Sequence, residues 1–215
     1  MRGSTSTLAV LALALGARAL PAQGVLDQFS YDNLRLSGIQ LDAGPLGSNK
    51  LRGTLAGGVR VDYGAIAPGV RVLLGLSYYG GQFNRRALAD FASRLRGVVN
   101  DPDSNFTIDV GAIKWWDLVG DIDLQYVLPQ GHTAHAYIGI GAGLHLHHAS
   151  GPAINGTFVQ DALDGVSAAL NGTVGVEFAI APAWRITLDG RGVISSDMSL
   201  VSLRGGLMYR FPGAR

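Results

Sequence analysis

The feature that most constrains the fold of this chain is a two-residue alternation of apolar and polar side chains, which recurs along most of its length. Such alternation is typical of β-strands that have one apolar and one polar face. The pattern predicts eight strands, at about residues 34–44, 54–65, 70–79, 113–128, 136–147, 167–180, 184–194 and 200–211. In the first of them the phase changes near Ser37 and Gly38, which predicts a β-bulge.

The connections between these predicted strands alternate in length. Residues 66–69, 129–132 and 181–183 are short and contain proline, whereas residues 45–53, 80–112 and 148–166 are longer. The last connection, residues 195–199, is short but falls on the same side as the long ones. Tight turns at one end and long loops at the other are typical of membrane β-barrels. The sequence therefore predicts an all-β fold, an eight-stranded antiparallel transmembrane β-barrel, with both ends of the barrel domain on the short-turn side.

The longest connection contains a helical pattern. Its apolar residues recur at intervals of three and four over residues 85–99, which predicts one short amphipathic helix on the rim of the barrel. The Asp-Pro-Asp sequence at 101–103 ends this pattern.

The two faces of the predicted strands differ in composition. The apolar face is rich in large and branched residues, whereas the polar face combines charged residues with many of the 31 glycines. The lumen of an eight-stranded barrel is narrow, and small residues there make room for longer ones. We therefore expect the polar face to point inward, where charges need partners of opposite sign. The predicted lumen charge network consists of Arg60, Asp62, Asp121, Asp123, Glu177, Asp189, Arg191 and Arg204.

Aromatic residues cluster near the ends of the predicted strands. This distribution predicts two belts at the lipid–water interfaces. The short-turn belt would contain Tyr63, Tyr126, Trp184, Tyr209 and Phe211, and the long-loop belt Tyr78, Tyr79, Trp115 and Trp116.

The N-terminal segment has the composition of a signal peptide. Arg2 precedes a short apolar run at 8–15, and Ala22 offers a cleavage site, which divides the chain into residues 1–22 and a barrel domain at 23–215. Without Arg2 and Arg18 the 17 basic residues become 15, against 16 acidic ones, so the mature net charge of −1 does not suggest nucleic-acid binding.

Cysteine is absent, which excludes disulfides and thiolate sites. No later run of 18 apolar residues suggests a helical anchor.

The predicted strand count, the loop alternation and the terminal segment SLRGGLMYRF at 202–211 carry a family resemblance. The mature chain resembles the small outer-membrane β-barrel proteins of the OmpA/OmpX/OmpW-like kind. It departs from them because Pro212, Gly213, Ala214 and Arg215 follow the terminal Phe211. The resemblance implies a monomeric protein of the cell outer membrane that is inserted by the barrel-assembly machinery and contacts outer-membrane lipid and lipopolysaccharide. It also implies a non-enzymatic role, without a cofactor, in envelope integrity, adhesion or the passage of small solutes.

Two other functions remain open. His145 and His147 would share one strand face, but the sequence gives no partner carboxylate, so no metal ligand is assigned. His148-Ala149-Ser150 resembles the His-x-Ser motif of outer-membrane lipid A deacylase barrels, although the motif lies on a later strand there. The first alternative is therefore a barrel enzyme acting on outer-membrane lipid. The second is a secreted, soluble, lipocalin-like binder whose apolar face points inward. No catalytic residue is assigned.

Overall fold

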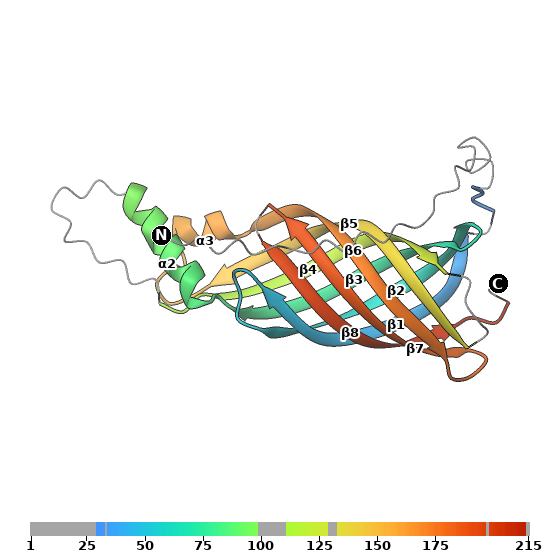
Figure 1. The fold of residues 1–215 in the computed structure, drawn as a ribbon. Coiled ribbons are helices and arrows are strands. Elements are labelled where there is room, and N and C mark those ends of the chain that lie inside the picture. The colour runs from blue at the N-terminus through green and yellow to red at the C-terminus, as the bar shows by residue number, and fades with distance from the viewer. Residues whose placement is uncertain (1–28, 33, 99–110, 129–132, 197, 214–215) are drawn as a thin grey trace, which may run out of the picture.

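The structure of the protein is a computed structural model, which describes residues 29–32, 34–98, 111–128, 133–196 and 198–213. Eight antiparallel strands close into a barrel (Figure 1). Each strand pairs with the next in the chain, and the last pairs with the first. The predicted fold class is therefore confirmed. The strands are β1 (Leu34–Ser48), β2 (Thr54–Ala67), β3 (Val70–Gln82), β4 (Lys114–Val127), β5 (Ala134–Ser150), β6 (Gly165–Ala179), β7 (Trp184–Ser195) and β8 (Ser199–Arg210).

Several strands run further toward the long-loop end than the alternation predicted. β1 continues through Pro45, opposite Leu55 of β2, and ends at Ser48. The prediction that the strand ends before Pro45 is wrong, because the ladder to β8 resumes at the next residue, where Leu46 pairs with Ser202. A single missing N–H is therefore tolerated within this strand.

The strand after the second short turn is also longer than predicted. β5 extends to Ser150, which pairs with Lys114 of β4, so the predicted loop at 148–166 is limited to residues 151–164. The predicted bulge in β1 is confirmed by a shift of register between Leu34 and Gly38.

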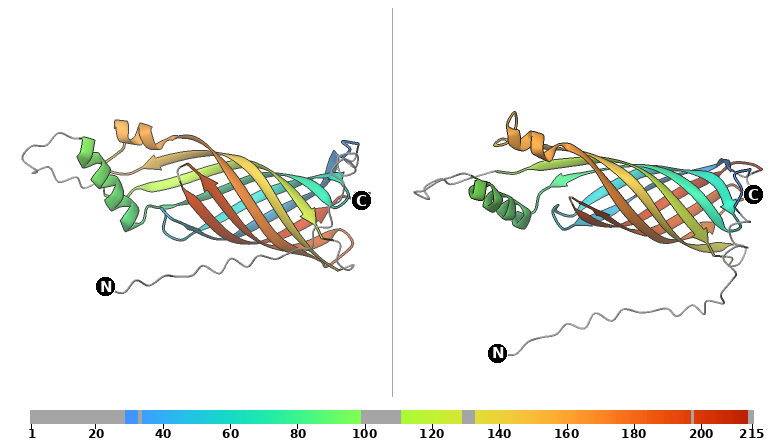
Figure 2. Two further views of the ribbon diagram at one scale, coloured as in Figure 1. Left: turned by 45° about the horizontal axis from the view of Figure 1, so that its top comes forward. Right: turned by 90° about the horizontal axis from the view of Figure 1, so that it is seen from above.

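Two helices lie at the long-loop end of the barrel, away from the C-terminal end (Figure 2). α2 (Arg85–Val98) confirms the predicted rim helix; Val99, its predicted last residue, lies outside the described residues. α3 (Phe158–Leu163) was not predicted, because six residues are too few to show a helical period.

The interior of the barrel has two parts. Polar and charged residues fill most of the lumen, and an apolar cluster fills its long-loop end. We call this cluster the plug; its larger members are Leu46, Leu51, Tyr79, Phe83, Ile113, Trp115, Val119, Ile154, Met198 and Leu200. Ala87, Leu88 and Phe91 of α2 pack against it, so the helix is anchored to the barrel through the plug.

The outer wall is apolar. Leu41, Leu76, Ile140 and Val174 are among the large apolar residues that lie exposed on it, while charged residues of the same strands are buried inside. This distribution contradicts the lipocalin-like alternative, in which the apolar face would line the interior. No helix in the part of the chain that the structure describes is long and apolar enough to cross a membrane.

Candidate functional site

The lumen near the short-turn end holds a group of linked ion pairs. Arg71 Nη1 lies 3.0 Å from Glu177 Oε2 and 3.6 Å from Asp62 Oδ2. Arg185 also pairs with Glu177, and Arg210 Nη1 lies 3.8 Å from Asp62 Oδ2. These residues line a vestibule of about 700 Å³ at the short-turn end. Each of the two carboxylates thus has two cationic partners.

The middle of the lumen is crossed by a second group of ion pairs. Arg60, which is only 1% exposed, lies 3.5 Å from Asp42 and 3.6 Å from Asp189. Arg204 Nη1 lies 3.1 Å from Asp42 Oδ1 and donates to Ser77 Oγ at the same distance. Side chains from β1, β2, β3, β7 and β8 therefore meet across the lumen.

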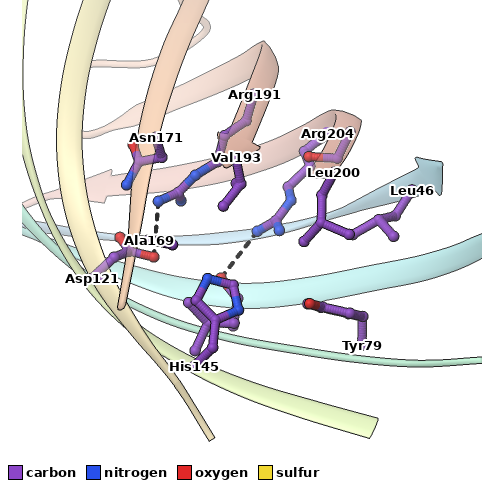
Figure 3. Close-up of a pocket in the computed structure, with 14 residues that line it drawn as sticks. Leu46, Tyr79, Asp121, His145, Ala169, Asn171, Arg191, Val193, Leu200 and Arg204 are labelled. Carbon is purple, nitrogen blue, oxygen red and sulfur yellow. Dashed lines mark hydrogen bonds and ion pairs between the residues drawn. The ribbon is translucent and has the colours of Figure 1, made fainter. Parts of the chain in front are cut away.

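A third group joins β7 to β4. Arg191 Nη2 lies 2.9 Å from Asp121 Oδ2 (Figure 3). The same nitrogen lies 3.5 Å from Asp123 Oδ1. Beside it lies a cavity of about 20 Å³, also lined by Asn171 and His145. A cavity of this size holds roughly one water molecule, so it offers no continuous path for solutes.

On the long-loop side of this cavity, the lumen contains the carboxylate of Asp117, which takes part in hydrogen bonds. Tyr79 Oη donates to Asp117 Oδ2 at 2.5 Å, and His145 Nδ1 lies 2.9 Å from the same oxygen. His147 stacks on Trp115 with the ring centroids 4.7 Å apart. Trp115 belongs to the plug, so the polar lumen ends there.

All eight residues predicted for the lumen charge network are buried in the barrel interior. The structure brings each of them into at least one ion pair with a residue of opposite charge, within 4 Å. Asp42 was missed, although it lies between the outward Leu41 and Ala43 and the alternation places it on the polar face. Asp117 was also missed, and its partners on β3 and β5 could not be identified before the register was known.

The predicted aromatic belts are only partly correct. At the short-turn end, Trp184 and Tyr209 lie on the outer wall with their ring centroids 4.9 Å apart. At the long-loop end, Tyr78 and Trp116 face outward, but Tyr79 and Trp115 are buried inside. Adjacent residues on a strand point to opposite faces, so only one member of each pair can face lipid.

The three clustered histidines also point to different faces of β5. His145 and His147 point into the lumen, whereas His148 lies on the outer wall. His148 Nδ1 is 2.7 Å from Asp164 Oδ2, and the N–H of Ala149 donates to Asp164 Oδ1 at 2.8 Å. Sequence reasoning did not identify this partner, which lies in the connection to β6. Within the described residues, no three His, Cys, Asp or Glu side chains are grouped so that they could hold a metal ion.

Comparisons with solved structures found several barrels to which this chain is similar. Neisserial surface protein A is 12% identical, with 81% of this chain and 96% of that chain covered and a TM-score of 0.54. The N-terminal β-barrel domain of Pseudomonas aeruginosa OprF is 12% identical, covering 82% and 98%, with a TM-score of 0.49. The attachment invasion locus protein Ail of Yersinia pestis, in complex with the heparin analogue sucrose octasulfate, is 12% identical, covering 82% and 99%, with a TM-score of 0.45.

No family model and no curated protein matches the chain. The likeness to Neisserial surface protein A shows that this chain has the fold of the small eight-stranded outer-membrane barrels.

Proposed function

We propose that this protein is a closed β-barrel of the bacterial outer membrane, with a structural or adhesive role in the envelope rather than a role in solute passage. The observation that carries this proposal is the distribution of side chains, with charges inside the barrel and apolar residues exposed outside. In water, an apolar wall around a whole barrel would be a strong aggregation hazard, whereas in a bilayer it faces acyl chains.

The dimensions of the strands also suit a membrane. A tilted strand needs about 9–11 residues to cross the hydrocarbon core. The eight strands contain 12 to 17 residues, so each has enough length to cross and to extend beyond the core. Trp184 and Tyr209 would lie at one interface, and Tyr78 and Trp116 at the other.

The side chains inside the lumen support a barrel without an open channel for solutes. One group of ion pairs lines the vestibule and two more lie between it and the plug, and the cavity beside Arg191 is about 20 Å³. The long-loop end instead presents α2 and α3, whose apolar residues pack against the plug, and this arrangement suits a role in contact or adhesion.

Several expectations belong to the same proposal. Residues 1–22 would direct export, and the terminal strand that ends at Phe211 would be recognised by the barrel-assembly machinery. Outer-membrane lipid and lipopolysaccharide would surround a monomer.

Two measurements test the proposal. The folded protein should require detergent and should migrate faster on a gel before heating than after it. In a planar bilayer it should show no steady conductance in the nanosiemens range, while an open porin in the same bilayer conducts. Solubility without detergent would contradict the membrane location, and a steady nanosiemens conductance would contradict the closed lumen.

A further inference from the structure

The ion pairs at the short-turn end of the lumen form an open chain of alternating charge. Its members, in order of contact, are Arg185, Glu177, Arg71, Asp62 and Arg210. Three cations therefore face two anions, and the chain ends on an arginine at both sides. The neighbouring group in the middle of the lumen pairs two arginines with two aspartates, so it does not compensate for this excess positive charge.

The arginine in the middle of the chain uses its donors within the protein. Arg71 Nη1 donates to Glu177 Oε2 at 3.0 Å, while Nε and Nη2 donate to Gln125 Oε1 at 3.2 and 3.0 Å. The guanidinium also lies 5.3 Å from the centre of the Tyr137 ring. Arg71 is therefore held by the barrel itself and links the two carboxylates.

The arginines at the two ends of the chain are less fully bonded. Arg185 contacts Glu177 through Nη1 alone, and Arg210 Nη1 lies 3.8 Å from Asp62 Oδ2, beyond hydrogen-bonding distance. Within the residues that the structure describes, neither guanidinium has another hydrogen bond or ion pair. A guanidinium carries five N–H donors, so most of those on Arg185 and Arg210 are available to a ligand.

The same two arginines are neighbours on adjacent strands. Arg185 pairs with Met208 in the β7–β8 ladder, and the backbone N–H of Arg210 donates to the carbonyl oxygen of Ala183 at 2.8 Å. Diagonal neighbours of this kind lie about 7–8 Å apart. Both side chains reach partners inside the barrel, and their positive charges repel one another. An anion between them would replace this repulsion with attraction on both sides and would close the chain into a ring of alternating charge.

The two guanidiniums are also accessible from the vestibule. The side chains of Arg185 and Arg210 are 22% and 20% exposed, whereas those of Glu177 and Asp62 are 1% exposed. Both arginines line the vestibule of about 700 Å³, which lies within the size range of small-molecule sites. An anion that enters the vestibule therefore meets exposed cations, while the carboxylates of the chain are buried.

The lining of the vestibule indicates the class of ligand. Guanidinium groups suit oxyanions, because their planar fork matches the two oxygens of a carboxylate or a phosphate. Much of the remaining lining is apolar, with Ile66, Pro68 and Val70 around the turn between β2 and β3 and Val127 at the end of β4. A carboxylate or phosphate on a short apolar body matches both parts of this lining.

We propose that the vestibule binds a small organic anion, a carboxylate or a phosphate on a short apolar body, between Arg185 and Arg210. The oxygens of the anion accept hydrogen bonds from both guanidiniums. The bound anion supplies the third negative charge of the group, and its apolar part lies against the β2–β3 turn. Short turns face the periplasm in an outer-membrane barrel, so the ligand is a periplasmic solute.

The side of the membrane from which the anion enters rests on the proposed function, but the site itself does not. Gel migration before and after heating reports the folded barrel without any anion. Failure of the proposed function and failure of anion binding therefore give different results. Every binding measurement uses protein that passes this folding test.

The experiment measures binding to the folded, mature protein by isothermal titration calorimetry, in a zwitterionic detergent and a chloride-free buffer. N-acetylalanine and inorganic phosphate are the probes in two separate arms, and N-acetylalanine amide is the uncharged control. We expect one saturable site for at least one of the two anions and none for the amide. Binding of only one of the anions would assign the ligand as a carboxylate or as a phosphate.

Two variants each remove one of the end arginines. In Arg185→Gln and in Arg210→Gln, the carboxylates Glu177 and Asp62 keep Arg71 as a partner, so both variants should fold. We expect each to lower the affinity for the anion at least tenfold, because hydrogen bonds to charged groups are lost. The double variant should show no saturable binding.

Arg35→Gln is the matched control. It also removes one positive charge, but Arg35 is exposed, donates to the carbonyl oxygen of Gly213 and does not line the vestibule. Its affinity should stay within twofold of the wild type. The proposal would be overturned if folded wild-type protein bound neither anion, if the amide bound equally well, or if Arg185→Gln and Arg210→Gln kept their affinity. An equal loss in Arg35→Gln would also overturn it, because binding would then follow net charge alone.

Discussion

The guanidinium of Arg191, on β7, lies 2.9 Å from the carboxylate of Asp121, on β4, so that an ion pair crosses the lumen between strands that are not neighbours in the barrel. Asp123 is a second partner of the same guanidinium, at 3.5 Å. Because these side chains are buried, each charge depends on the others for its stabilisation. The barrel is thus held by pairs across its interior as well as by its ladders.

Arg191→Met tests the strength of this cross-lumen pairing. The variant leaves Asp121 and Asp123 buried without their shared cation, and breaking a buried pair costs about 3–5 kcal/mol. We expect this decrease in the free energy of unfolding, measured by urea titration in lipid vesicles. Arg52→Met, at an exposed loop position, should stay within about 0.5 kcal/mol of the wild type. Equal stabilities of the two variants would contradict the network.

Gly175→Ala tests how tightly the lumen is packed. A Cβ at Gly175 would lie 2.6 Å from the ring of Tyr137 and 2.8 Å from Asp189 Cβ, closer than van der Waals contact allows. We expect a loss of about 1–3 kcal/mol from overpacking, measured in the same titration. At Gly192, on the outer wall, a Cβ would meet nothing within 4 Å, so Gly192→Ala is the matched control and should not destabilise the protein. A neutral Gly175→Ala would indicate a looser lumen.

The strand pattern predicted more of the fold than of the site. The alternation of apolar and polar residues placed Arg60 and Arg191 in the lumen, because a strand has only two faces. It did not predict that β1 would continue through Pro45, since the tolerance of a missing N–H depends on which ladder position it occupies. The pairing of His148 with Asp164 joins residues of a strand and a loop, and only the three-dimensional path of that loop brings them together.

The three tryptophans provide a prediction about which residues face lipid. Trp115 is buried in the plug, whereas Trp116 and Trp184 lie on the outer wall. In variants that keep one tryptophan, with the other two changed to phenylalanine, brominated lipid should quench the fluorescence of Trp116 and Trp184 strongly and that of Trp115 weakly. Equal quenching of all three would contradict the opposite orientation of the neighbouring Trp115 and Trp116.

The membrane position of the barrel is tested most directly by comparing Ile140 and Phe158, which are 72% and 73% exposed. Ile140 lies on the outer wall in β5, and Phe158 begins α3 beyond the long-loop end. The chain has no cysteine, so Ile140→Cys and Phe158→Cys can each carry a single spin label in protein reconstituted into vesicles. We expect the label at 140 to collide mainly with dissolved oxygen, which concentrates in the bilayer, and the label at 158 to collide mainly with a water-soluble nickel chelate. Equal access of the nickel chelate to both labels would contradict a lipid-facing outer wall.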